Sequence, residues 1–241
     1  MAADRILCFS EEQRKGLLDA DGEGALREKI RLLPPVAEPD LPIPFPPSRA
    51  AEEKQKYKRD FCERHGLGEE DRLLVAVVED LTESGAAILS RALPDALAAG
   101  IRLVFCGMGG TAEVERLLRA AAFAGDRFLT MFSPSREPGR EVLLAADAVL
   151  LLHAAEAERE SEILAHGALP IAPDPERKGG YGYEPTALAE ALASLQAEYQ
   201  KRGSFRGAAK EAVRMAKARR CDAAAALLSA VETEKGVCSY V

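Results

Sequence analysis

Short glycine-containing turns are the first places in this sequence whose residue types and spacing could do chemistry. Gly107, Gly109 and Gly110 follow an apolar run and precede a predicted helix. Backbone amides in such a turn can face a phosphate or a ribose, because glycine has no side chain to keep the ligand away. A second pair, Gly179 and Gly180, could form an anion-binding nest. The competing interpretation at both places is a tight structural turn, which needs glycine anyway.

Side chains that hold metal ions or build disulfide frameworks are sparse. The three histidines and five cysteines lie far apart, and the sequence contains no C-x-x-C pair. Zinc sites and disulfide scaffolds require closer, paired spacing. We therefore expect reduced thiols, no metal site and no cofactor, and we assign no catalytic residue.

Basic side chains concentrate near the end of a chain that is acidic as a whole. The formal net charge is -7, yet Arg206, Lys210, Arg214 and Lys217 recur at helical steps and predict one positively charged helix face. Such a face is either solvated or a docking surface for an acidic protein partner. The overall charge and the lack of interleaved aromatic residues argue against nucleic acid as a partner.

These residues must be positioned by an alternation of short apolar strands and amphipathic helices. Strands are predicted at 73–78, 103–106, 128–132, 149–152 and 169–172, with helices at 50–65, 86–99, 111–124, 137–146 and 156–167. An alanine-rich tail at 185–231 is predicted to be helical, with a break near Gly203. This pattern predicts an α/β fold: a Rossmann-like parallel sheet flanked by helices, followed by C-terminal helices. Ligands of such sheets bind at the carboxyl ends of the strands.

The first 50 residues differ from the rest in composition. A predicted strand at 3–9 and a helix ending near Ala20 are followed by seven prolines between 33 and 47, which indicate an extended connector. We therefore expect three parts, at 1–50, 51–200 and 201–241. No apolar run approaches the roughly 18 residues of a membrane helix. The first ten residues do not resemble an export signal, so we expect a cytoplasmic location.

In order along the chain, several segments resemble the C-terminal, donor half of a GT-B glycosyltransferase of the glycogen and starch synthase type. They are Ala3 to Ile6, Lys29 to Pro35, Lys58 to Leu67, Leu73 to Val78, Arg102 to Gly109, Ala145 to Leu151, Ala165 to Ile171 and Ala187 to Leu192. The resemblance covers nearly the whole chain. It implies a single GT-B half that grips the diphosphate and base of a nucleotide-sugar. It also implies that 1–50 is a remnant of the acceptor domain and its hinge.

The same resemblance identifies where the chain departs from the family. The family loop S-R-L-T-x-Q-K-G corresponds to Glu79 to Gly85, where Thr82 is kept, Asp80 stands at the arginine position and the lysine is absent. A carboxylate about 4 Å from a phosphate would cost on the order of 4 kcal/mol at an effective dielectric constant of about 20. The family also has a pair of acidic residues, separated by seven others, before and within the helix that corresponds to 156–167. Of this pair only Glu162 is kept, either as an acceptor for a ribose hydroxyl or as an exposed acid.

The remaining candidate donor-binding residues are also implied by the resemblance. Ser133 and Arg136 fall where the family accepts the nucleobase, with Pro134 in place of the aromatic stacking partner. Gly179 and Gly180 stand near the family's phosphate-holding T-G-G-L turn. In the family the terminal helices return to the acceptor domain, so the basic face at 206–217 is the expected docking surface for that domain or for another protein.

These departures predict a catalytically degenerate, glycosyltransferase-like domain that binds a partner or a sugar-related ligand. The alternative is one half, or one subunit, of an active ADP- or UDP-glucose-dependent glucosyltransferase, a retaining hexosyltransferase that needs a separate acceptor domain. The partners that we consider are an acceptor domain or other protein, a nucleotide-sugar and a second copy of this chain. We expect neither nucleic acid nor a membrane.

Overall fold

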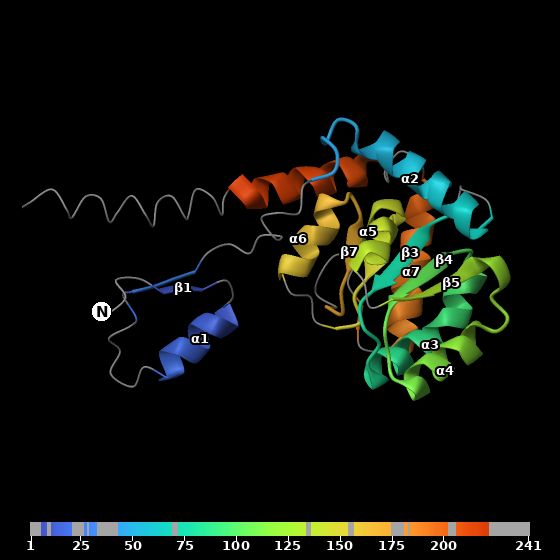
Figure 1. Cartoon of the computed structure of the whole chain (residues 1–241), viewed down its shortest axis with the longest axis horizontal. Coiled ribbons are helices and arrows are strands. Elements are labelled where there is room, and N and C mark those ends of the chain that lie inside the picture. Colours follow the sequence, from blue (N-terminus) through green and yellow to red (C-terminus); the bar gives the residue numbers. More distant parts are fainter. Residues whose placement is uncertain are drawn as a thin grey trace, which may run out of the picture.

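The computed structural model describes residues 6–8, 11–20, 27, 29–32, 43–68, 72–133, 136–153, 157–174, 181–182, 184–201 and 206–221. Within them, a five-stranded parallel sheet forms the centre of the larger unit (Figure 1). Its strands are β3 (Leu74–Val78), β4 (Arg102–Gly107), β5 (Phe128–Phe132), β6 (Ala148–Leu150) and β7 (Leu169–Ile171). Their order across the sheet is β5-β4-β3-β6-β7, with every pairing parallel. The predicted α/β, Rossmann-like sheet is thereby confirmed.

The strand order brings two loops together that are distant in sequence. From β3 the chain moves outward through β4 to β5, and it then returns to the other side of β3 to form β6. Val75 pairs with Leu103 of β4 on one side and with Ala148 of β6 on the other. Crevices form where the order of strands reverses in this way, outside their carboxyl ends. The loops after β3 and β6 therefore flank the expected ligand edge.

Helices cover both faces of the sheet. They are α2 (Ala50–His65), α3 (Glu83–Ala98), α4 (Thr111–Ala121), α5 (Arg136–Ala145), α6 (Ala157–Ala165) and α7 (Pro185–Gln200), with a short η1 (Gly125–Arg127) before β5 and a further helix at 206–221. Helices α3, α4 and α7 pack on one face, and α2, α5 and α6 pack on the other. No described helix has the length and apolar character that a membrane crossing requires.

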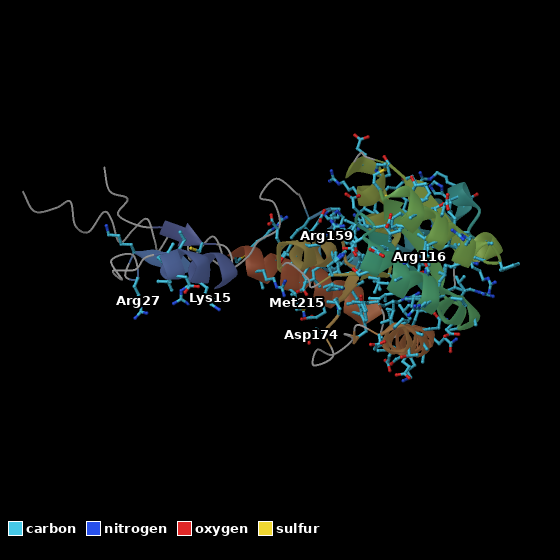
Figure 2. All side chains as sticks on the ribbon, turned by 90° about the horizontal axis from the view of Figure 1, so that it is seen from below. Lys15, Arg27, Arg116, Arg159, Asp174 and Met215 are labelled. Atoms are coloured by element: carbon cyan, nitrogen blue, oxygen red, sulfur yellow. The ribbon has the colours of Figure 1, made fainter. Side chains whose placement is uncertain are left out.

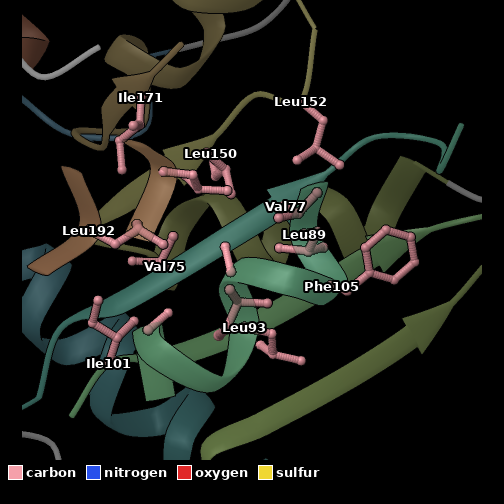
Figure 3. Close-up of a cluster of buried hydrophobic side chains, with 14 of the residues drawn as sticks. Val75, Val77, Leu89, Leu93, Ile101, Phe105, Leu150, Leu152, Ile171 and Leu192 are labelled. Atoms are coloured by element: carbon pink, nitrogen blue, oxygen red, sulfur yellow. The ribbon is translucent and has the colours of Figure 1, made fainter. Parts of the chain in front are cut away.

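Alternating side chains of the central strand divide the core into two layers. Val75 and Val77 lie in one buried cluster with Leu89 and Leu93 of α3 (Figure 3). Leu74 and Ala76 point to the opposite cluster, which the side chains of α2 and α5 complete. A strand buried on both faces must be apolar at consecutive positions, and β3 reads L-V-A-V-V. The continuous apolar run is therefore the physical reason for the central place of β3.

Glycines follow two of the helices. Gly66 follows α2 with φ at 65°, and Gly100 follows α3 with φ at 88°. This left-handed conformation is open to glycine at little cost and turns the chain out of a helix. Helix α3 begins earlier than predicted, at Glu83 rather than Ala86, because Thr82 caps its first turn: Oγ1 of Thr82 accepts a hydrogen bond from the Gly85 amide at 3.2 Å.

A second, two-stranded sheet contains residues before the proline-rich segment. β1 (Ile6–Cys8) and β2 (Ile30–Leu32) pair in parallel, with α1 (Glu11–Ala20) between them. The segment that resembles the family hinge, Lys29 to Pro35, thus contains a strand. Most of the proline-rich connector, the predicted break near Gly203 and the tail after 221 lie outside the described residues.

Helix α2 is confirmed, but its charged face is not wholly at the surface. Lys54 and Lys58 are buried at the end of the sheet where β3 and β6 begin. Lys58 Nζ donates to Asp147 Oδ2 at 2.5 Å and to the Tyr199 hydroxyl at 2.7 Å. Lys54 Nζ donates to the carbonyl oxygens of Leu143, at 2.9 Å, and of Ala146 near the end of α5. These contacts attach α2 to the sheet, to α5 and to α7.

Candidate functional site

Two neighbouring carboxylates in the loop after β3 bind backbone amides of the adjacent loops. Glu79 Oε1 accepts a hydrogen bond from the Leu152 amide, after β6, at 2.5 Å. Asp80 Oδ1 accepts one from the Met108 amide, after β4, at 2.9 Å. Because β6 and β4 lie on opposite sides of β3, the two acids connect the three central loops at the carboxyl edge. The amides of Leu152 and Met108, which could face an anionic ligand, are therefore bound by side chains of the chain itself.

The loops after β3 and β4 approach each other unusually closely. A Cβ atom on Gly107 would lie 2.1 Å from the carbonyl oxygen of Glu79, which no larger residue can tolerate. The Leu81 amide donates to the Met108 carbonyl at 2.7 Å, and Leu81 forms an isolated bridge with Gly109. These two glycines thus have a structural reason to be present. Their role in allowing loop contact is sufficient to explain them without a ligand.

An imidazole lies between the Glu79 carboxylate and the Thr82 hydroxyl. His153 Nδ1 is 3.7 Å from Glu79 Oε2, and His153 Nε2 is 2.8 Å from Thr82 Oγ1. Burial raises the pKa of Glu79 above its ordinary value. The Leu152 amide and the nearby His153 and Arg159 oppose that increase without cancelling it. The carboxylate, imidazole and hydroxyl therefore form a row along the ligand edge.

The acid expected to accept a ribose hydroxyl is already paired. Arg159 of α6, labelled in Figure 2, donates to the carboxylate of Glu162 and to the carbonyl oxygen of Val78 at the end of β3. The side chains of Arg159 and Glu162 are 28 % and 24 % exposed, so the pair lies partly within the protein. Arg159 brings positive charge to the switch point, the place between the loops after β3 and β6 where the strand order reverses. The carboxylates of Glu162 and Glu79 both offset this charge.

The other predicted site residues lie at several places along the same edge. Gly110 is the residue before α4, and Ser133 directly follows β5. Arg136 begins α5, but its side chain lies outside the described residues. Gly179 and Gly180 are outside them as well. The strand order β5-β4-β3 separates Ser133 from Thr82 by one intervening strand, so the structure does not bring these two residues into one contact group.

Three residues at this edge were not predicted as site residues. In the sequence, Glu79 is only the first residue of the loop that departs from the family, His153 is one of three widely spaced histidines, and Arg159 belongs to no motif. A usable signal was present, because Glu79 and His153 each follow a predicted strand, and these strands are neighbours in a Rossmann-like sheet. The described residues contain no cluster of three or more histidine, cysteine or acidic side chains that could hold a metal ion.

Solved structures with the same fold are glycosyltransferases of the GT-B type. The chain superimposes on the catalytic domain of starch synthase IV from Arabidopsis thaliana, bound to ADP and acarbose, with a TM-score of 0.64 and 14 % identity. It superimposes on Anabaena Alr3699/HepE in complex with UDP (TM-score 0.63, 16 % identity) and on a glycosyltransferase from Rickettsia africae (TM-score 0.63, 16 % identity). The likeness confirms the predicted GT-B-type fold.

These matches cover nearly all of this chain but only part of each neighbouring structure. They cover 93 %, 97 % and 99 % of this chain, but 56 %, 64 % and 64 % of starch synthase IV, HepE and the Rickettsia protein respectively. The chain therefore spans less than two thirds of the length of these neighbours. No protein-family model matches the sequence, and no curated protein matches it.

Proposed function

We propose that this chain is a GT-B donor-type domain that does not transfer sugar by itself and serves to bind a partner or a sugar-related ligand. The observation that carries this proposal is the pair of acids after β3, which occupy the Leu152 and Met108 amides at the switch point. In the family that this chain resembles, cations in the same loop hold the departing diphosphate. Here a diphosphate would meet the carboxylates of Glu79 and Asp80 instead.

The electrostatic argument extends to the histidine and the arginine that lie nearby. His153 faces the Glu79 carboxylate, and Arg159 donates to the carboxylate of Glu162. An approaching diphosphate would have to displace the Glu162 carboxylate before it gained the charge of Arg159, and beside His153 it would meet the Glu79 carboxylate. Charge-assisted pairs of this kind are roughly twice as strong as neutral hydrogen bonds. Neither group therefore substitutes for the family's arginine and lysine.

Calorimetric titration of the protein with ADP, UDP, ADP-glucose and UDP-glucose tests this proposal. We expect no measurable heat at ligand concentrations up to about 1 mM, which corresponds to a binding free energy weaker than about -4 kcal/mol. Micromolar binding would overturn it and support the alternative, an ADP- or UDP-glucose-dependent glucosyltransferase half that works with a separate acceptor domain. The observation in favour of that alternative is that starch synthase IV and HepE were solved with ADP and UDP.

The helix at 206–221 provides the surface through which we expect this domain to bind a protein partner. Ala212, Val213 and Ala216 are buried on one side of it, in clusters with residues of α6 and α2, and Arg219 Nη1 donates to Ser161 Oγ at 3.1 Å. The adjoining side is exposed and carries the basic face, which consists of Arg206, Lys210, Arg214 and Lys217. We assign this face to an acidic protein surface, either an acceptor domain or a second copy of the chain.

Sedimentation velocity at low and high salt tests the second-copy interpretation. Self-association through the basic face should weaken as salt screens the charges. The double variant K210E/K217E should then remain monomeric at every salt concentration. A wild-type monomer at high protein concentration and low salt would rule out a second copy as the partner.

A further inference from the structure

Thr82, His153 and Glu79 have the arrangement of a nucleophile, a general base and the group that orients it. The Thr82 hydroxyl is 2.8 Å from His153 Nε2, and the other ring nitrogen of His153 faces Glu79 Oε2 at 3.7 Å. The three side chains come from two loops that only the β3 and β6 pairing brings together. Geometry of this kind, rather than sequence order, is what identifies a nucleophile with its base.

The hydrogen bonds around Thr82 set the direction in which its proton points. Oγ1 of Thr82 accepts a hydrogen bond from the Gly85 amide at 3.2 Å. When His153 carries its hydrogen on Nδ1, its Nε2 accepts the Thr82 hydroxyl hydrogen, and the Ser84 hydroxyl, 3.3 Å from Thr82 Oγ1, then acts as a donor to Thr82. The Nδ1 hydrogen is then on the side of the Glu79 carboxylate. A base at Nε2, with Nδ1–H on the side of an acid, is the tautomer that nucleophilic catalysis requires.

Neighbouring residues fix the positions of the Glu79 carboxylate and the Thr82 hydroxyl. Glu79 is fixed by the Leu152 amide through its other oxygen, so its Oε2 remains for His153. Gly85 permits the arrangement, since a Cβ at that position would lie 3.0 Å from a methyl group of Leu152 and 3.2 Å from Thr82 Oγ1. Glu79 acts here as a positioning residue.

A substrate can reach the row from solvent. Thr82 is exposed, and the His153 side chain is 43 % exposed. The backbone amides of Glu83 and Ser84 lie in the first turn of α3 beside Thr82, where amides have no partner within the helix. Amides at that position can stabilise negative charge that develops on an oxygen next to the hydroxyl. The acids Glu79, Asp80 and Glu83 disfavour an anionic substrate.

We propose that this row cleaves small, uncharged carboxylic esters, a reaction distinct from sugar transfer. Thr82 Oγ1 attacks the carbonyl carbon while His153 Nε2 takes the hydroxyl proton. The ester C–O bond then breaks, the alcohol leaves with the proton from His153, and the acyl group remains on Thr82. Water attacks the acyl carbonyl as His153 takes its proton. The carboxylic acid leaves, and Thr82 regains its hydrogen from His153.

Hydrolysis of p-nitrophenyl acetate by the full chain tests this proposal. We expect wild-type protein to release p-nitrophenolate about a hundredfold faster than T82V and H153Q, the range typical of general base catalysis. T82S keeps a hydroxyl and a helix cap and should retain activity. T111V is the matched control, because Thr111 is an exposed threonine at the start of α4, and its rate should equal that of wild type.

Two further measurements separate a catalytic role from a structural one. H153Q leaves the Thr82 cap in place, so its thermal unfolding should match wild type although its hydrolysis is lost. Mass spectrometry after rapid acid quenching should find one acetyl group on the peptide that contains Thr82. Equal rates in wild type, T82V and H153Q, or acetyl groups found on lysines alone, would overturn the proposal. These outcomes do not depend on whether a nucleotide binds.

Discussion

Glu79 accepts a hydrogen bond from the backbone amide of Leu152 at 2.5 Å, across the junction between β3 and β6. The neighbouring Asp80 makes the corresponding bond to the Met108 amide on the β4 side. Oriented backbone amides at the carboxyl edge of a parallel sheet are the groups that anionic ligands use. In this protein the Leu152 and Met108 amides are bound by its own carboxylates, which connects the fold directly to the proposed absence of nucleotide-sugar transfer.

Asp80→Arg is expected to increase the affinity for ADP. The substitution removes a carboxylate from the switch point and places a cation there, and each 1.4 kcal/mol gained in this way is about a tenfold decrease in Kd. Asp80→Asn removes only the negative charge and should give a smaller increase. Calorimetric titration at low salt measures both.

The control for this experiment is Asp95→Arg, which makes the same change in charge on the exposed, C-terminal part of α3. If Asp95→Arg increased ADP affinity as much as Asp80→Arg does, the effect would come from net charge alone. That result would contradict a role for the loop after β3. Thermal unfolding of each variant checks that the loss of the Asp80 bond to Met108 leaves the fold intact.

Lys58→Met is expected to lower the free energy of unfolding by about 3 kcal/mol, because it leaves the carboxylate of Asp147 without its ion-pair partner in a largely buried position. The double variant K58M/D147N should be more stable than K58M, since no unpaired charge remains. Urea denaturation measures both differences. Lys56→Met on the exposed side of the same helix should change stability by no more than about 0.5 kcal/mol. Equal losses in K58M and K56M would contradict this account.

Lys54 is expected to make stability depend on pH. Burial, with a contribution from the nearby Lys58 charge, lowers the pKa of Lys54 to about 7, although Asp147 acts in the opposite direction. Between about pH 7 and 10.5, the unfolded chain therefore binds a proton at Lys54 that the folded chain has lost. The free energy of unfolding should rise with pH in this window, by up to about 1.4 kcal/mol per pH unit.

The pKa of Lys58, which lies beside Lys54 and Asp147, is shifted in the opposite direction. Burial favours its neutral form, but Asp147 and Tyr199 together outweigh burial and raise its pKa. Its contribution to stability is present below pH 10.5 and is lost only as the pH rises through its folded pKa. Urea denaturation of wild type and K54M from pH 6.5 to 9.5 isolates the Lys54 contribution. Parallel pH profiles for the two proteins would show that Lys54 does not titrate in this range.

Gly107→Ala is expected to destabilise the protein by about 3 kcal/mol or more, because the added Cβ would lie 2.1 Å from the Glu79 carbonyl oxygen and force the two loops apart. Gly207→Ala, in the helix at 206–221, has no atom within 4 Å of the added Cβ and should stabilise by about 0.5 kcal/mol. Chemical denaturation compares the two. A Gly107→Ala protein as stable as wild type would mean that the loops after β3 and β4 do not approach this closely.

The local sequence pattern was sufficient to predict the architecture. Consecutive apolar residues at 73–78 require a strand buried on both faces, and the alternating helices require parallel strands. The predicted helices at 50–65 and 86–99 correspond to α2 and α3, and Gly66 and Gly100 follow them with positive φ. The burial of Lys54 and Lys58 was not predicted, since a charged helix is typical of the surface and their partners lie far away in the sequence.

What the sequence by itself determined is therefore the order of elements, the two-sided core and the presence of two acids, Glu79 and Asp80, directly after β3. Only the tertiary structure decided what those acids do. The partners of Glu79 and Thr82, Leu152 and His153, are 73 and 71 positions away in the chain. The physical reason is that a hydropathy pattern records which face of an element is buried. The direction in which a polar side chain points depends on which strands become neighbours and in what register they pair.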